Sequence, residues 1–144
     1  MLIQLLLGSV IIILTIIVQV IILGVLSSFF VQVSLWQSKG YKIVKNAVVI
    51  VISVLWLVLG ITINTWIWAF AFQFIGEFAN LEEALYFAIS SFTTLGYGDL
   101  ILSKEWRIMG ALSAVNGLIV FGLNTAFLVE LMIKTWGTSR TKKD

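Results

Sequence analysis

The chain has 144 residues, of which 60% are hydrophobic and 11% are charged, and its mean hydropathy is +1.10. A soluble domain of this length could not bury so much apolar side-chain surface, so the composition indicates a membrane protein. Cysteine and histidine are both absent, which excludes disulfides, thiol chemistry and histidine ligation of metals. No cluster of catalytic side chains is evident, and we expect no enzyme activity.

Residues 1–35 are predicted to form an additional N-terminal transmembrane helix. No charged residue occurs before Lys39, and Ile, Leu and Val dominate a stretch that exceeds the ~20 apolar residues a spanning helix needs. A cleaved signal peptide is the alternative. Such a peptide begins with basic residues, however, and none precedes the apolar core of this chain.

Residues 36–45 are basic, with three lysines close to two aromatic residues: Trp36, Lys39, Tyr41, Lys42 and Lys45. Lysines beside aromatic side chains are typical of a membrane–water boundary. The sequence leaves open whether this segment is a loop or a short interfacial helix, and in either form we expect it on the cytoplasmic side.

Two further apolar runs predict an outer helix over residues 46–75 and an inner helix over residues 106–134. Glutamates follow the first run, whereas basic residues follow the second and fill a short tail over residues 136–144. Lysine and arginine thus cluster at ends that alternating topology puts on one side, which is the positive-inside pattern. We predict three spans of a cell membrane, with the N-terminus outside and the C-terminus cytoplasmic.

Residues 81–93, between these runs, have the pattern of a short helix. Asn80 followed by Glu83 has the layout of a helix N-cap and its partner. At 1.5 Å per residue this helix covers only about half of the hydrocarbon thickness, so it must enter the membrane and return. Irregular backbone at such depth is tolerated only where protein buries it or where it lines a watery path.

Glycine alternates with other residues in the segment 94–98 that follows this helix, at Gly96 and Gly98. Glycine accepts positive φ, and alternating left- and right-handed backbone angles would turn successive carbonyl groups the same way. Four chains around an axis would then present stacked oxygen rings that replace the hydration shell of a potassium ion. The short helix would direct the negative end of its dipole toward that ion.

The run 93–99, TTLGYGD, resembles the signature of the tetrameric potassium channels. Residues 85–92 are similar to the pore helix of that family, and residues 117–123 resemble the inner helix of its two-helix bacterial members. The resemblance covers residues 46–135 as a pore domain. It implies an all-α membrane fold with an outer helix, a re-entrant pore helix, an extended selectivity filter and an inner helix, assembled as a four-fold symmetric homotetramer.

By this resemblance the chain would conduct potassium passively and selectively, with K⁺ in the filter as the only cofactor, lipids as surroundings and no nucleic acid as partner. The residues expected to bind K⁺ are Thr94, Leu95, Gly96 and Tyr97. The residues expected to support the filter are Thr93, Gly98, Asp99, Tyr86 and Ser90. One stripe of the inner helix is expected to line the cavity: Phe121, Thr125, Val129 and Ile133.

Leu95 and Ser90 are among the positions that depart from the family pattern. Leu95 replaces the commoner valine, which should alter the packing behind the filter more than its chemistry, because the carbonyl binds the ion. Ser90 stands where some bacterial relatives carry a glutamate that pairs with the aspartate after the filter. Asp99 therefore needs another partner, and the Tyr86 hydroxyl is the candidate.

Four residues of the inner helix have alternative roles. Gly117 is interpreted either as a gating hinge or as a small residue that lets helices pack closely. Asn116 and Asn124 need protein partners inside the membrane, and a neighbouring subunit is favoured over the cavity. Glu130 is a costly carboxylate in a span; four copies would form an acidic ring at the inner mouth, or each would pair with a nearby lysine such as Lys134.

Other functions also stay open: a silent auxiliary subunit, a weakly selective cation channel, or a subunit of a potassium transporter. Such transporters typically carry four diverged filter loops in one chain, whereas this chain has one intact loop, which argues against the last. The sequence does not determine the gating stimulus or the role of the N-terminal helix.

Overall fold

The computed structural model of the chain describes residues 1–36 and 42–137. These residues form four helices: α1 (Leu2–Trp36), α2 (Lys42–Phe74), α3 (Leu81–Phe92) and α4 (Arg107–Gly137). Three of the helices contain stretches long and apolar enough to cross a membrane, at Leu2–Phe29, Val44–Phe74 and Arg107–Thr135. No strand occurs among the described residues, and the prediction of an all-α membrane fold is confirmed.

The helix ends differ from the predicted ones by a few residues. Helix α2 begins at Lys42 rather than at residue 46, because no glycine or proline separates the lysine from the apolar run. Helix α4 continues to Gly137, a few residues past the predicted end. The centre of the predicted basic segment, residues 37–41, and the tail from residue 138 onward lie outside the described residues.

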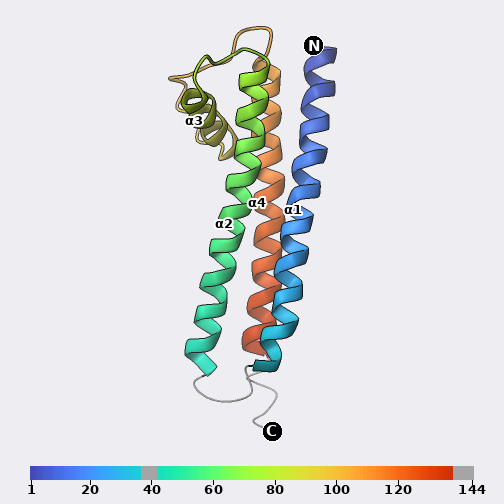
Figure 1. Cartoon of the computed structure of the whole chain (residues 1–144), viewed down its shortest axis with the longest axis vertical. Coiled ribbons are helices and arrows are strands. Elements are labelled where there is room, and N and C mark those ends of the chain that lie inside the picture. Colours follow the sequence, from blue (N-terminus) through green and yellow to red (C-terminus); the bar gives the residue numbers. More distant parts are fainter. Residues whose placement is uncertain (37–41, 138–144) are drawn as a thin grey trace.

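Helices α2 and α4 lie side by side, with α1 on one side of the pair and α3 on the other (Figure 1). Helix α1 packs against both α2 and α4, and α3 does the same from the opposite side. The N-terminus lies at the end of the molecule that carries α3, and α4 ends at the other. The short helix therefore occupies only one end of a three-helix array, as its length requires.

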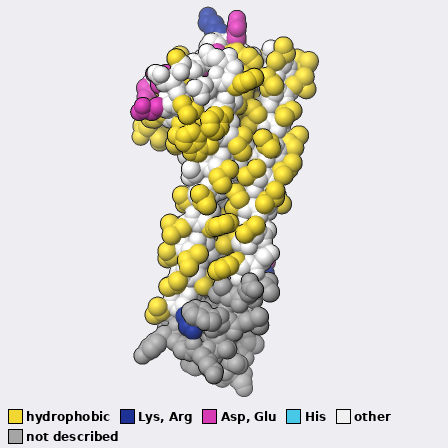
Figure 2. Space-filling model, viewed as in Figure 1, with side chains coloured by type: hydrophobic (Ala, Val, Ile, Leu, Met, Phe, Trp, Pro, Cys, Tyr) yellow, Lys and Arg dark blue, Asp and Glu magenta, His cyan; other side chains and the backbone are white. Residues whose placement is uncertain are grey.

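The buried side of α1 combines polar residues with Gly8, Ile22 and Leu26, whereas its exposed side is mostly apolar. Gln4, Thr15 and Gln19 are buried, while Ile13 and Ile21 are each 59% exposed. This inverts the usual amphipathic helix, because lipid and not water is the expected solvent. Hydrophobic side chains cover the visible face along the helices, and charged ones lie toward its ends (Figure 2).

Helix α2 ends in a Schellman motif built on Gly76. This glycine has φ 81°, its amide donates to the Gln73 carbonyl at 3.0 Å, and the Glu77 amide donates to the Phe72 carbonyl at 3.3 Å. These two bonds satisfy carbonyl groups at the end of the helix. The motif ends the span and turns the chain toward α3.

An aromatic core fixes α3 between α2 and α4. Trp68, Phe72, Phe92 and Met109 are at most 1% exposed and belong to one cluster. The rings of Phe72 and Phe87 meet edge to face with centroids 5.1 Å apart, which links α2 to α3 directly. The short helix is thus held by packing from two long helices, so its C-terminal end has a defined position.

Candidate ion-conducting site

Helix α3 begins where the sequence predicts, but without the predicted capping bond. Asn80 is the N-cap residue with extended backbone angles, and its side chain makes no bond to the amides of the first turn. Its amide nitrogen instead lies 3.4 Å from Glu83 Oε1, a long contact between exposed groups. Glu82 and Glu83 in the first turn still complement the positive end of the helix dipole.

After α3 the chain makes a turn in which two backbone amides donate to the same carbonyl. The amides of Leu95 and Gly96 both donate to the Ser90 carbonyl, at 2.9 and 3.1 Å. A trans peptide places its carbonyl opposite its amide hydrogen, and the chain contains no cis bond among the described residues. The carbonyls of Thr94 and Leu95 therefore both point away from Ser90, whereas successive carbonyls of a β-strand alternate.

Positive φ recurs at every second residue of this segment. Thr94 has φ 60°, Gly96 has φ 56° and Gly98 has φ 79°. The two glycines match the predicted alternation. Thr94 was not predicted to take part, because β-branched residues rarely adopt positive φ; its conformation is an outlier of the kind that clusters at functional sites.

Residues 94–99 are exposed in the single chain. Leu95 is 55% exposed and Tyr97 is 68% exposed, unusual values for apolar and aromatic side chains beside a packed core. Ser90, in contrast, is buried at the end of α3. The side of the segment that faces α3 is therefore anchored, while the side that carries the carbonyl groups is open.

Asp99 has the partner that the sequence suggested. The Tyr86 hydroxyl donates a hydrogen bond to Asp99 Oδ2 at 2.7 Å. This bond holds the pKa of Asp99 below its usual value and raises the pKa of Tyr86. The bond ties the end of the segment back to the middle of α3, in the place of the carboxyl pair of some bacterial relatives.

Glu77 closes the outer loop, a role that the sequence analysis missed. Its two carboxylate oxygens accept bonds from the amide and the hydroxyl of Ser103, both at 2.7 Å. The Ser103 carbonyl in turn accepts the amides of Trp106 and Arg107 at the start of α4. The signal that could have revealed it is Gly76, because a glycine at the end of a span predicts the turn that positions the next side chain.

Gly117 is a close-packing residue of α4. A Cβ at this position would overlap the carbonyl oxygen of Phe92, the last residue of α3. The backbones of α3 and α4 therefore approach as closely as only glycine permits. The sequence left two roles open for Gly117. The structure supports the close-packing role, and the role as a gating hinge stays a prediction.

The predicted cavity stripe of α4 is mostly exposed in the single chain. Thr125, Val129 and Ile133 are exposed, and Phe121 is half-buried against Phe92 with ring centroids 6.3 Å apart. Asn116 and Asn124 lie on another face. They bond to α1 of the same chain, so the expectation that they bridge subunits or line the cavity is wrong.

Glu130 forms an ion pair with Lys134. The lysine Nζ lies 2.6 Å from Glu130 Oε1, one turn further along α4, and both side chains are more than half exposed. An exposed pair of this kind contributes little to stability. The pairing with Lys134, one of the two alternatives for Glu130, is present, and the acidic ring stays a prediction.

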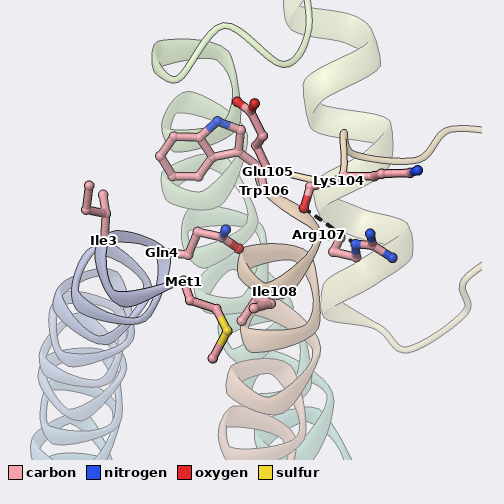
Figure 3. A pocket seen from close by; sticks show the side chains of 8 residues that line it. All are labelled: Met1, Ile3, Gln4, Lys104, Glu105, Trp106, Arg107 and Ile108. Carbon is pink, nitrogen blue, oxygen red and sulfur yellow. Dashed lines mark hydrogen bonds between the residues drawn. The ribbon is translucent and has the colours of Figure 1, made fainter.

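A separate pocket lies between the first turn of α1 and the start of α4, lined by Met1, Ile3, Gln4, Lys104, Glu105, Trp106, Arg107 and Ile108 (Figure 3). Gln4 extends from α1 toward α4, whereas Lys104 and Arg107 point away from α1. The Arg107 Nε lies 3.5 Å from the Lys104 carbonyl. The polar groups do not converge, so residues 94–99 remain the candidate site.

Comparison with known proteins identifies a family whose matched region contains residues 94–99. The model of a family described as "Ion channel" matches residues 60–134, just over half of the chain. The voltage-gated potassium channel regulatory subunits KCNG3 of Mus musculus and Rattus norvegicus are each 30% identical over 61 residues. That match covers 42% of this chain, and the chain spans only 14% of the length of these relatives.

No solved structure matches the chain significantly. The family match includes residues 60–74 of α2, all of α3 and residues 94–99, and most of α4. It excludes α1. With the half-length helix, the alternating backbone and the family match in agreement, the chain belongs to the ion channel family, with a pore domain of the potassium channel type.

Proposed function

We propose that this chain is the subunit of a homotetrameric channel that conducts potassium passively and selectively. The observation that carries the proposal is the backbone of residues 94–98, with positive φ at alternate residues and two successive carbonyls turned to the same side. Carbonyl oxygens that face one way can replace the hydration shell of K⁺. An ordinary turn or strand would have no reason to adopt this backbone.

In the proposed filter, backbone carbonyls contribute most of the K⁺ ligands and the Thr94 hydroxyl adds the innermost ring: Thr94, Leu95, Gly96 and Tyr97. A single chain supplies only one side of each ring, which supports assembly of four copies around an axis. The exposed apolar face of α4, with Leu118 60% and Ile133 65% exposed, supports the same conclusion, because part of it would be covered by neighbours or line the cavity.

Below the filter, the stripe from Phe121 to Ile133 would line a cavity that continues to the cytoplasmic mouth. Four Glu130 carboxylates near that mouth would attract cations, although each is partly neutralised by its Lys134. The positive-inside pattern supports an orientation with the α3 end outside the cell membrane, because that end carries Lys104 and Arg107 whereas seven lysines and arginines lie in residues 39–45 and 134–143.

Ion flux through the purified protein in liposomes tests the proposal. We expect K⁺ and Rb⁺ flux at least tenfold above Na⁺ flux. Gly96→Ala should abolish the flux, because a Cβ at φ 56° costs about 1–2 kcal/mol in each of four subunits. Gly24→Ala is the matched control, since Gly24 has no neighbour within 4 Å and ordinary helical φ. Comparable Na⁺ flux would contradict potassium selectivity.

A second candidate function is suggested by the names of the matched relatives, which are regulatory subunits. A chain of that kind would carry a filter sequence but conduct only in a mixed assembly with other subunits. Absence of flux in liposomes, together with a well-folded helical protein, would favour this function. Flux from the chain alone would exclude it.

A further inference from the structure

Four side-chain amides and one hydroxyl form a polar network between α1, α2 and α4. Gln19 of α1 donates to Asn124 Oδ1 of α4 at 2.6 Å and accepts from Asn64 Nδ2 of α2 at 2.8 Å. Thr15, one turn earlier on α1, accepts from Asn116 Nδ2 of α4 at 2.6 Å. All five side chains are at least 95% buried, so these contacts are structural features of the interior.

The two attachments of α1 to α4 lie on either side of both mid-span glycines. Asn116 and Asn124 are eight residues apart, about 12 Å along the helix, and Gly117 and Gly122 lie between them. Gly117 is supported by the backbone of Phe92, whereas Gly122 has no neighbour within 4 Å. With no proline in the chain, these glycines are the positions at which α4 can bend most easily.

A bend between the attachments would break one of them. Thr15 and Gln19 are only four residues apart on α1, and Gln19 is also held by Asn64, so it cannot follow a moving Asn124. The Trp56 indole donates to the Ile22 carbonyl at 3.1 Å and fixes α1 to α2 one turn further on. Helix α1 is therefore a fixed attachment for the half of α4 that follows its two glycines.

We propose that α1 is a splint that keeps α4 straight. Thr15 holds α4 on the N-terminal side of its two glycines, and Gln19 holds α4 on their C-terminal side. The splint opposes bending of α4, and release of the Gln19–Asn124 bond permits it. Asn124 Nδ2 and Asn64 Oδ1 have no partner in the straight form, so the network is not fully satisfied there and the cost of releasing it is reduced. Gln19 and Asn124 are positioning residues, since neither belongs to the filter.

Distances between spin labels test the splint without relying on ion conduction. The chain has no cysteine, so two introduced ones are labelled alone. A lower pair, Phe29→Cys with Met132→Cys, and an upper pair, Val10→Cys with Ala111→Cys, join exposed sites of α1 and α4 on the two sides of the glycines. Labelled chains are diluted with unlabelled ones, so that only distances within one chain are measured.

Gln19→Met removes the amide at similar volume, and Asn124→Leu removes the same bond from the other side. In both variants we expect the lower-pair distance to broaden and shift by about 5 Å, the displacement that a kink of ~20° gives over ten residues. The upper pair should be unchanged. Ser53→Ala is the control, because Ser53 is equally buried but bonds only to the Val49 carbonyl of its own helix.

An unchanged lower-pair distance in both variants would overturn the splint, and equal changes in both pairs would show instead that α1 detaches as a whole.

Gating provides a second readout, which rests on the proposed function. Gln19→Met and Asn124→Leu should each raise the open probability about threefold to tenfold, the range for one interhelical hydrogen bond in a membrane. The double variant should add nothing further to the open probability, because Gln19→Met alone already removes the bond to Asn124 as well as the bond from Asn64. An unaltered open probability in conducting variants would restrict Gln19 to a structural role.

Discussion

Thr94 is a β-branched residue held at φ 60°, a conformation that costs such residues about 1–2 kcal/mol. The two amides that follow it both bond to the Ser90 carbonyl and hold the turn in place. Gly96 and Gly98 adopt similar φ values without the steric penalty. The strain is therefore confined to the residue nearest α3, where both a hydroxyl and a carbonyl are proposed to bind K⁺.

The bond between Tyr86 and Asp99 supports the outer end of the same segment. We expect Tyr86→Phe to accelerate slow inactivation about threefold to tenfold, the range for a typical net hydrogen bond, because both groups are exposed. The measurement is the decay of potassium current during a sustained opening. Glu82→Gln is the control, since this carboxylate lies on the same helix and plays no part in the bond; an equal effect there would assign the change to surface charge.

The same bond predicts a pH dependence. Because Tyr86 holds the pKa of Asp99 below its usual value, the stabilisation is complete above about pH 4 and is lost as the pH falls through the lowered pKa. Inactivation of the wild type should therefore be insensitive to this group between pH 5 and 8. Tyr86→Phe should move the acid transition to higher pH, and an unmoved transition would mean that Asp99 does not control it.

At the scale of elements, the position of α3 depends on contacts with α2 and α4 rather than on its own length. A helix of 12 residues is marginal by itself, and most of its stability comes from packing. Aromatic contacts attach it to α2, and the contact of Phe92 with Gly117 attaches its end to α4. Movement of α4 at Gly117 would therefore displace the start of the proposed filter.

Gly117→Ala should destabilise the folded protein by about 1–3 kcal/mol, the usual cost of overpacking, because the new methyl group overlaps the Phe92 carbonyl. It should also impair K⁺ flux, since the end of α3 must shift. Thermal unfolding in detergent and liposome flux measure the two effects. Gly122→Ala is the matched control for stability in the same helix, with no neighbour to meet. Full stability of Gly117→Ala with altered gating alone would favour the hinge over the packing role.

At the scale of the whole molecule, α1 supplies partners for polar groups that the pore domain would otherwise present to lipid. Asn64, Asn116 and Asn124 lie in the family-matched region, yet each bonds to α1, which lies outside it. The exposed side of α1 is mostly apolar, interrupted by the exposed hydroxyls of Ser9, Ser27 and Ser28. The helix is thus an integral part of the subunit and not a peripheral anchor.

Removal of residues 1–34 should lower the stability of the subunit by about 2 kcal/mol, since four interhelical hydrogen bonds of roughly 0.6 kcal/mol each are lost. Unfolding in a graded denaturing detergent measures the change. Replacement of Asn64, Asn116 and Asn124 by leucine in the truncated chain should recover most of the stability. A truncated chain as stable as the full one would contradict the role of the network.

Sequence reasoning located the three spans, the half-length helix and the site, because lipid imposes strong rules on length and polarity. It also named the Tyr86 hydroxyl as the partner of Asp99, since few polar groups were within reach. It assigned Asn116 and Asn124 wrongly, because a polar residue in a span predicts a partner but does not name the helix that supplies it. It missed the role of Glu77 and the positive φ of Thr94, both of which depend on loop geometry.

By itself the sequence determined the spans, since an apolar run of given length predicts one, and it related TTLGYGD after a short helix to the filter signature of the potassium channels. Only the tertiary structure decided which faces meet. The buried side of α1 is defined by four polar contacts with two other helices, and the role of Gly117 is defined by the backbone of α3. Composition and spacing are local properties of the chain, whereas these contacts join residues up to 105 positions apart.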